Sequence, residues 1–107
     1  KLRFLKPFNR ECKLEFAGGV NRPPMERTQA VAALYKKAFD IAKQLGWKLQ
    51  EAAVGGGSDG NFTAALGIPT LDGLGAVGEG AHAADESIVL SELPKRAALL
   101  AGLIETA

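Results

Sequence analysis

Hydrophobic positions recur with two different periods along the chain. Over residues 1–20, apolar and charged side chains alternate, which is typical of half-buried strands, and a glycine pair ends the run. The prolines of residues 21–24 then exclude regular structure, because proline lacks an N–H and makes the residue before it extended. From Thr28 to Gly46, apolar steps of three and four predict an amphipathic helix with these two residues as its caps. Its predicted buried face is Val31, Leu34, Tyr35, Ala38, Ile41, Ala42 and Leu45.

The second half of the chain alternates between short extended and helical patterns. Strands are expected over 49–54 and 69–74, a short helix over 59–66, and an extended piece over 87–90. A last helix is expected after a Ser91 cap, with Pro94 in its first turn and Leu93, Ala97, Leu100, Ala101 and Ile104 buried.

This order predicts an α/β fold with a mainly parallel sheet. Such sheets bind ligands at the carboxyl ends of their strands. The Gly55–Ser58 turn and the Gly75–His82 loop both follow predicted strands, so we expect them to open toward one crevice.

Length and composition exclude several classes of protein. The 107 residues suffice for one domain, and 47% hydrophobic with 23% charged residues is ordinary for a folded chain. A net charge of +1 does not indicate nucleic-acid binding, and no apolar run approaches the roughly 20 residues that span a bilayer. The single Cys12 permits no internal disulfide, which leaves the compartment open with the cytoplasm favoured. The start at Lys1, already in an alternating pattern, indicates a truncated chain.

The only histidine, His82, is followed closely by Asp85 and Glu86 and flanked by glycine and alanine. Small neighbours leave the imidazole open to an ion, and a nearby carboxylate can orient a metal-bound histidine. A catalytic zinc takes three protein ligands, so His82 is either an ordinary loop histidine or one part of a larger site. A catalytic pair with Cys12 is less favoured than a free or buried thiol.

Arg22 and the glycine turn are the other candidate binding features. Arg22 is stiffened by the prolines after it and could grip a carboxylate with two hydrogen bonds, or it could be a surface arginine in a turn. The turn at residues 55–58 precedes a helix and could hold an anion on backbone N–H groups. It could equally be a tight turn capped by Ser58 or Asp59.

Together, these motifs resemble one known family. Asn-Arg-Pro-Pro-Met at 21–25, Gly-Gly-Gly-Ser-Asp-Gly-Asn-Phe at 55–62, Gly-Ile-Pro-Thr-Leu-Asp-Gly-Leu-Gly at 67–75 and the run at 78–86 follow in that order. This order resembles the C-terminal segment of the co-catalytic zinc peptidases, which include glutamate carboxypeptidases (carboxypeptidase G), aminoacylases, succinyl-diaminopimelate desuccinylases and dipeptidases.

The resemblance implies two domains. Residues 1–22 would be the last strands of an α+β lid that often mediates dimerisation. Residues 23–107 would be the C-terminal part of the zinc-exopeptidase catalytic domain, with its mainly parallel sheet and flanking helices. By the same resemblance His82 is a zinc ligand, Arg22 binds the substrate carboxylate and the Gly57 backbone lines the substrate site. Ser58, Asp59 and Glu86 would be supporting residues.

The activity implied by the resemblance is amide hydrolysis of peptides or N-acyl amino acids by a zinc-bound hydroxide, in a homodimer. Glutamate release is one form of it, and cobalt or manganese could replace the two zinc ions. The general base and the other ligands would lie in the N-terminal half of the catalytic domain, so the chain alone should be inactive. The alternatives are a non-catalytic α/β module that binds small anions and a metal-free scaffold relative.

Overall fold

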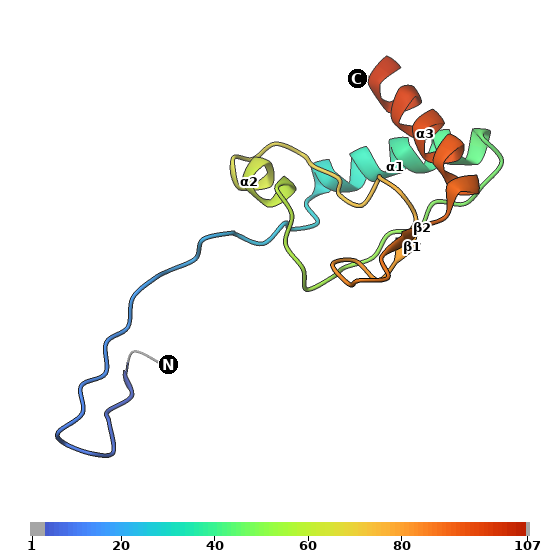
Figure 1. The fold of residues 1–107 in the computed structure, drawn as a ribbon. Coiled ribbons are helices and arrows are strands. Elements are labelled where there is room, and N and C mark those ends of the chain that lie inside the picture. The colour runs from blue at the N-terminus through green and yellow to red at the C-terminus, as the bar shows by residue number, and fades with distance from the viewer. Residues whose placement is uncertain (1–3, 107) are drawn as a thin grey trace.

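The computed structural model describes residues 4–106 (Figure 1). In chain order the elements are helix α1 (Gln29–Gln44), helix α2 (Gly60–Ala65), strand β1 (Gly78–Glu79), strand β2 (Ser87–Ile88), the 3-10 turn η2 (Leu90–Glu92) and helix α3 (Leu93–Glu105). Within residues 4–106, no helix combines the length and apolar character that a membrane span requires.

Local hydrogen bonds set both ends of α1, as the sequence predicts. The Thr28 hydroxyl accepts from the Val31 N–H at 3.2 Å, which satisfies one of the unpaired donors of the first turn. At the other end Gly46 has a φ of +85°, a left-handed conformation that glycine adopts without a steric penalty. The helix buries Ala38 and Ala42 completely, which confirms the centre of the predicted face, while Leu45 at its edge is exposed.

The core lies where α3 packs across α1 (Figure 1). Small residues allow the close approach: a Cβ added to Gly102 of α3 would come within 2.9 Å of Ile41 Cγ2 on α1. The fully buried Leu99 fills the space between the helices. Partly buried apolar side chains complete the cluster: Tyr35, Phe39, Ile41, Trp47, Leu71, Leu74 and Leu103.

The predicted buried face of α3 is wrong. Leu99 is buried, whereas Leu100 is 39% exposed and Ile104 is 75% exposed. The helix is apolar on more than one side, so its own pattern does not decide which side meets α1. Only the face that carries Gly102 permits the close approach to Ile41.

The start of α3 also departs from the sequence prediction. The helix begins at Leu93 with Glu92 at the N-cap position, and no side chain caps it. Ser91 lies inside η2 and is not the predicted cap. Pro94 does lie in the first turn, where its missing N–H leaves no hydrogen bond unmade.

β1 and β2 form a two-stranded antiparallel ladder that pairs Gly78 with Ile88 and Glu79 with Ser87. The extended piece predicted at 87–90 is thus a strand over its first half only. Residues 49–54 and 69–74 form no strand, because a strand needs a hydrogen-bonded neighbour and residues 4–106 offer them none. The mainly parallel sheet therefore stays a prediction.

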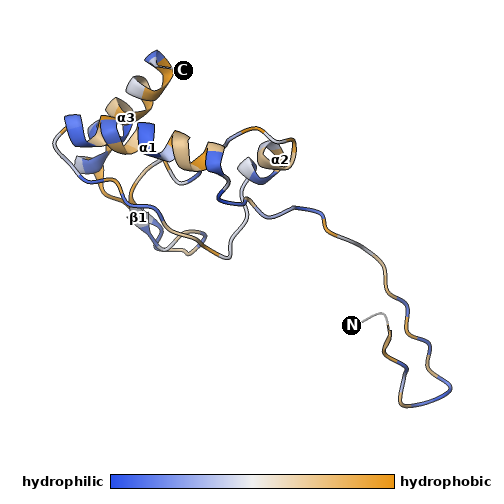
Figure 2. Cartoon of the chain, turned by 180° about the vertical axis from the view of Figure 1, so that it is seen from behind, coloured by the Kyte–Doolittle hydropathy of each residue, from blue (hydrophilic) through white to orange (hydrophobic). Residues whose placement is uncertain are grey.

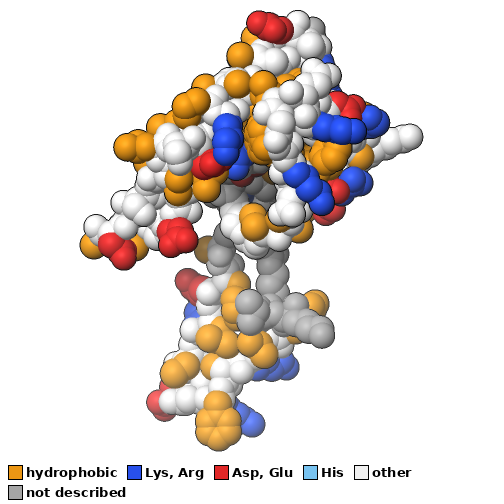
Figure 3. Space-filling model, turned by 90° about the vertical axis from the view of Figure 1, so that its right-hand side faces the viewer, with side chains coloured by type: hydrophobic (Ala, Val, Ile, Leu, Met, Phe, Trp, Pro, Cys, Tyr) orange, Lys and Arg blue, Asp and Glu red, His pale blue; other side chains and the backbone are white. Residues whose placement is uncertain are grey.

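The N-terminal segment runs away from the helices (Figure 1). Apolar and polar residues alternate along it (Figure 2), yet residues 4–22 contain no strand. Residues 1–3 of the predicted alternating run lie outside the described residues. Phe4, Phe8 and Val20 are almost fully exposed, so the predicted half-buried strands are not formed here. The radius of gyration is 19.8 Å, against about 13 Å for a compact chain of this size. Figure 3 shows apolar side chains over both the helical part and this segment.

Candidate functional site

The glycine turn leads into α2 through a set of short-range hydrogen bonds. The Ser58 hydroxyl accepts from the Gly60 N–H at 3.2 Å, and the Ser58 carbonyl accepts from the Asn61 N–H at 3.2 Å. Asp59 occupies the N-cap position, but its side chain makes no capping bond. Gly67, with a φ of +82°, follows the last turn. The predicted short helix is confirmed. Of the two predicted caps, Asp59 holds the N-cap position without a side-chain bond, and Ser58 bonds one residue before it.

One buried side chain joins α2 to the proline turn of residues 21–24. The Asn61 side chain donates from Nδ2 to the Pro23 carbonyl at 2.8 Å and accepts at Oδ1 from the Ser58 N–H at 2.8 Å. Asn61 is only 8% exposed, and no other polar residue within residues 4–106 is buried. One amide group therefore bonds to two segments 38 residues apart.

Arg22 lies along the surface that α2 and the glycine turn provide. Its guanidinium carbon lies 4.6 Å from the centroid of the Phe62 ring, and its Nη1 donates to Asp59 Oδ1 at 3.3 Å. A Cβ added to Gly57 would approach Arg22 Cδ within 2.7 Å, so glycine is needed for this contact. We call this group, Arg22 with Gly57, Asp59, Asn61 and Phe62, the arginine seat.

The arginine seat can present the guanidinium to an anion. The Arg22 side chain is 35% exposed and Asp59 is 96% exposed, so their ion pair is weak and open to competition. Cation–π contact with Phe62 orients the planar group from one face. The bond to Asp59 uses one donor of the fork, and the remaining donors suit a planar carboxylate.

His82 lies in the loop between β1 and β2, where it is exposed. His82 has a φ of +69°, and among the described residues other than glycine it is the one with a positive φ. This left-handed conformation is disfavoured by about 1–2 kcal/mol. The Ala83 N–H donates to the Gly80 carbonyl at 2.8 Å, and Glu86 Oε2 accepts from the His82 N–H at 3.3 Å. Local bonds thus hold the backbone in a strained form of the kind that gathers at functional sites.

The described residues do not form a complete metal site. No group of three His, Cys, Asp or Glu side chains within residues 4–106 is placed to hold a metal ion. One exposed imidazole can fill a single coordination position, so a catalytic metal at His82 would need further ligands. Cys12 is exposed in the N-terminal segment.

The predicted residues thus divide into two groups. Arg22, Gly57, Ser58 and Asp59 come together in and beside the arginine seat. His82 and Glu86 meet in their own loop. The roles of Asn61 and Phe62 were missed by sequence reasoning, although both lie in the Gly-Gly-Gly-Ser-Asp-Gly-Asn-Phe motif at residues 55–62.

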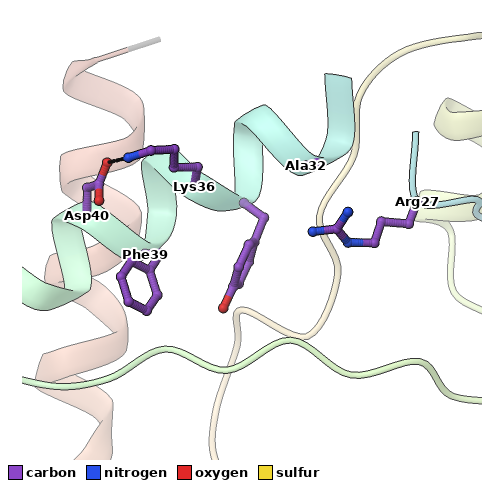
Figure 4. Close-up of a pocket in the computed structure, with 6 residues that line it drawn as sticks. Arg27, Ala32, Lys36, Phe39 and Asp40 are labelled. Atoms are coloured by element: carbon purple, nitrogen blue, oxygen red, sulfur yellow. Dashed lines mark hydrogen bonds and ion pairs between the residues drawn. The ribbon is translucent and has the colours of Figure 1, made fainter. Parts of the chain in front are cut away.

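A separate hollow of about 340 Å³ lies along α1 and contains none of the predicted site residues (Figure 4). The charged groups around it are paired with one another or with neighbours. Lys36 contacts Asp40 at 2.6 Å, and Arg27 makes two hydrogen bonds to Glu51 at 2.9 and 3.0 Å. These bonds from Arg27 hold the pKa of the Glu51 carboxyl below its ordinary value, against a smaller opposing effect of desolvation. The hollow is thus bordered by satisfied ion pairs.

The arginine seat and the His82 loop lie within a match to a known family. The chain belongs to the peptidase family M20/M25/M40, whose model matches residues 10–106. This membership makes the protein a hydrolase of the metallopeptidase class. No curated protein and no solved structure matches the chain.

Proposed function

We propose that this chain is the C-terminal part of a zinc-dependent amidohydrolase of the carboxypeptidase type. Its substrates are peptides or N-acyl amino acids, with glutamate-releasing substrates as the first class to test. The observation that carries the proposal is the arginine seat, where stacking on Phe62 and close contact with Gly57 hold a cation at a surface. Family membership supplies the reaction class.

Arg22 binds the free carboxylate beside the amide bond that is cleaved. Two parallel N–H donors of a guanidinium match the two oxygens of a carboxylate, and such charge-assisted pairs are stronger than neutral hydrogen bonds. Asp59 holds the side chain in place in the absence of substrate. Because Asp59 is almost fully exposed, the substrate carboxylate can displace it at little cost.

His82 provides one zinc ligand, and Glu86 supports the loop that presents it. The remaining ligands and the general-base glutamate come from the N-terminal part of the catalytic domain. Zinc, when bound, polarises the carbonyl and lowers the pKa of its water; cobalt or manganese could serve the same purpose. The parent protein also forms a homodimer through the lid domain that ends near residue 22.

The anion-binding alternative is weakened by the bonding at the start of α2. The backbone N–H groups of Ser58, Gly60, Asn61 and Phe62 all donate to acceptors within the chain. An anion at the start of α2 would have to displace these bonds. The turn is therefore better explained as the support of Arg22.

The direct test is hydrolysis by the full-length parent protein. We expect release of the amino acid from N-acyl amino acids and C-terminal residues from peptides. Chelation should abolish the activity and zinc should restore it, while the 107-residue chain alone should be inactive. Absence of amide hydrolysis by the zinc-loaded parent would contradict the proposal, and retained anion binding in that case would favour the non-catalytic alternative.

A further inference from the structure

We infer that Asn61 is a positioning residue that sets the location of Arg22 and thereby the preference for carboxylate-bearing ligands. The inference rests on the proposed function, because it concerns the arginine that binds the substrate carboxylate. Asn61 does not contact Arg22 through its own amide; it acts on the adjacent Pro23 and on the glycine turn.

The amide of Asn61 is suited to this task by its chemistry. It offers both donors and an acceptor, and here each type is used: Nδ2 for the Pro23 carbonyl and Oδ1 for the Ser58 N–H, both at 2.8 Å. Since the residue is 8% exposed, water cannot easily replace either bond. No other standard side chain of this length supplies a donor and an acceptor together.

The two bonds fix the distance between the backbone beside Arg22 and the glycine turn. The Pro23 carbonyl belongs to the residue after Arg22, and the prolines at 23 and 24 restrict rotation of the backbone there. The contacts of the Arg22 side chain are with Gly57, Asp59 and Phe62, all in the glycine turn and the first turn of α2. Asn61 thus joins the backbone of the arginine to the surface on which its side chain lies.

The buried core is separate from this contact. Ala38, Ala42, Leu49 and Leu99 form it, and Asn61 is not among them or among the side chains packed against them. A change at Asn61 should therefore shift Arg22 without unfolding the helical part.

Asn61→Asp is the most informative variant. A carboxylate keeps the acceptor for the Ser58 N–H but loses the donor to Pro23 and places a negative charge near that carbonyl oxygen. Asn9→Asp is the matched control, because the Asn9 side chain also accepts a backbone N–H, from Glu11 at 3.0 Å, but in the exposed N-terminal segment. Arg22→Gln, alone and combined with Asn61→Asp, tests whether the two residues act together.

The measurement is calorimetric binding to the zinc-loaded full-length protein. The ligands are L-glutamate, L-alanine and L-phenylalanine, each compared with its α-amide, none of which carries an N-acyl bond to be cleaved. We expect the wild type to prefer a carboxylate over its amide. Asn61→Asp should reduce this preference about 10-fold, because a displacement on the order of 1 Å is costly at a binding site. Asn9→Asp should leave it unchanged.

A general loss of folding would weaken the carboxylate and the amide equally, so the ratio separates positioning from structural damage. In the double variant, Asn61→Asp should add little to the loss caused by Arg22→Gln, since both changes remove one interaction. An unchanged ratio in Asn61→Asp, additive losses, or a wild type without carboxylate preference would each overturn the inference. Asn61-dependent binding without any amide hydrolysis would instead overturn the proposed function and leave the inference standing.

Discussion

The arginine seat and the His82 loop reach their geometry by different means. The seat is built from segments 37 and 38 residues apart, joined by the Arg22–Asp59 and Asn61–Pro23 contacts. The His82 loop is held by hydrogen bonds that span three or four residues. A short-range loop can keep its shape when distant parts of the chain move, whereas the seat depends on how two segments dock.

The comparison also separates the two parts of the proposed chemistry. Under the proposed function, the seat would govern which ligand is held and the loop would govern the metal. If the two are independent, a change in one should alter its own property and leave the other intact. The following variants test that independence.

The largest effect is expected for His82→Ala in the full-length protein. Loss of a direct ligand should remove bound zinc and lower kcat/KM by at least about 100-fold, since loss of supporting residues alone typically costs 10- to 100-fold. Metal analysis and steady-state kinetics check this. The preference for carboxylate over amide ligands should persist in binding assays. Full zinc content in the variant would show that His82 is an ordinary loop histidine.

Gly57→Ala should affect the seat only. The new Cβ would lie within 2.7 Å of Arg22 Cδ, so the side chain must shift. We expect kcat/KM for carboxylate substrates to fall about 10-fold, with no change in zinc content. Gly56→Ala is the matched control, because its Cβ would meet nothing within 4 Å and its φ is not in the left-handed region. Equal effects of the two substitutions would argue against the packing explanation.

Gly102→Ala tests the packing of α3 against α1, outside both regions. The added methyl would lie 2.9 Å from Ile41 Cγ2, and overpacking of this kind costs about 1–3 kcal/mol. The higher helix propensity of alanine offsets about 1 kcal/mol of this cost. We therefore expect the free energy of unfolding, measured by chemical denaturation, to fall by about 1 kcal/mol. Ile41→Leu in the same protein removes the β-branch that carries Cγ2 and should recover part of it. A gain in stability would show that the helices can separate freely.

The smallest effect concerns acid stability at the Arg27–Glu51 pair, which belongs to neither region. The pKa of Glu51 is lowered in the folded chain, chiefly by its hydrogen bonds from Arg27. Its stabilising contribution is therefore present above the unfolded glutamate pKa of about 4.3 and is lost as the pH falls through the lower folded value. Glu51→Gln should thus lower Tm slightly at neutral pH and have less effect in acid.

Arg27→Gln should reproduce this pH dependence, because either substitution removes the same two hydrogen bonds. Melting curves at several pH values check both variants. A difference between wild type and Glu51→Gln that grows as the pH falls would contradict the assignment.

The sequence alone determined the features that depend on near neighbours. Both ends of α1 follow from Thr28 and Gly46, and the short α2 follows from the glycine turn before it and Gly67 after it, because each of these acts within a few residues. The order of motifs was also sufficient to indicate the peptidase family, which the match over residues 10–106 confirms.

The tertiary structure alone decided which apolar face of α3 is buried and which residues hold Arg22. The α3 sequence is compatible with more than one buried face, and the close contact of Gly102 with Ile41 selects the one that carries Leu99. The role of Asn61 depends on the Pro23 carbonyl, a backbone group 38 residues away, and no local sequence pattern predicts this contact. Extended segments likewise become strands only when a partner edge lies beside them, and that partner is a property of the assembled fold.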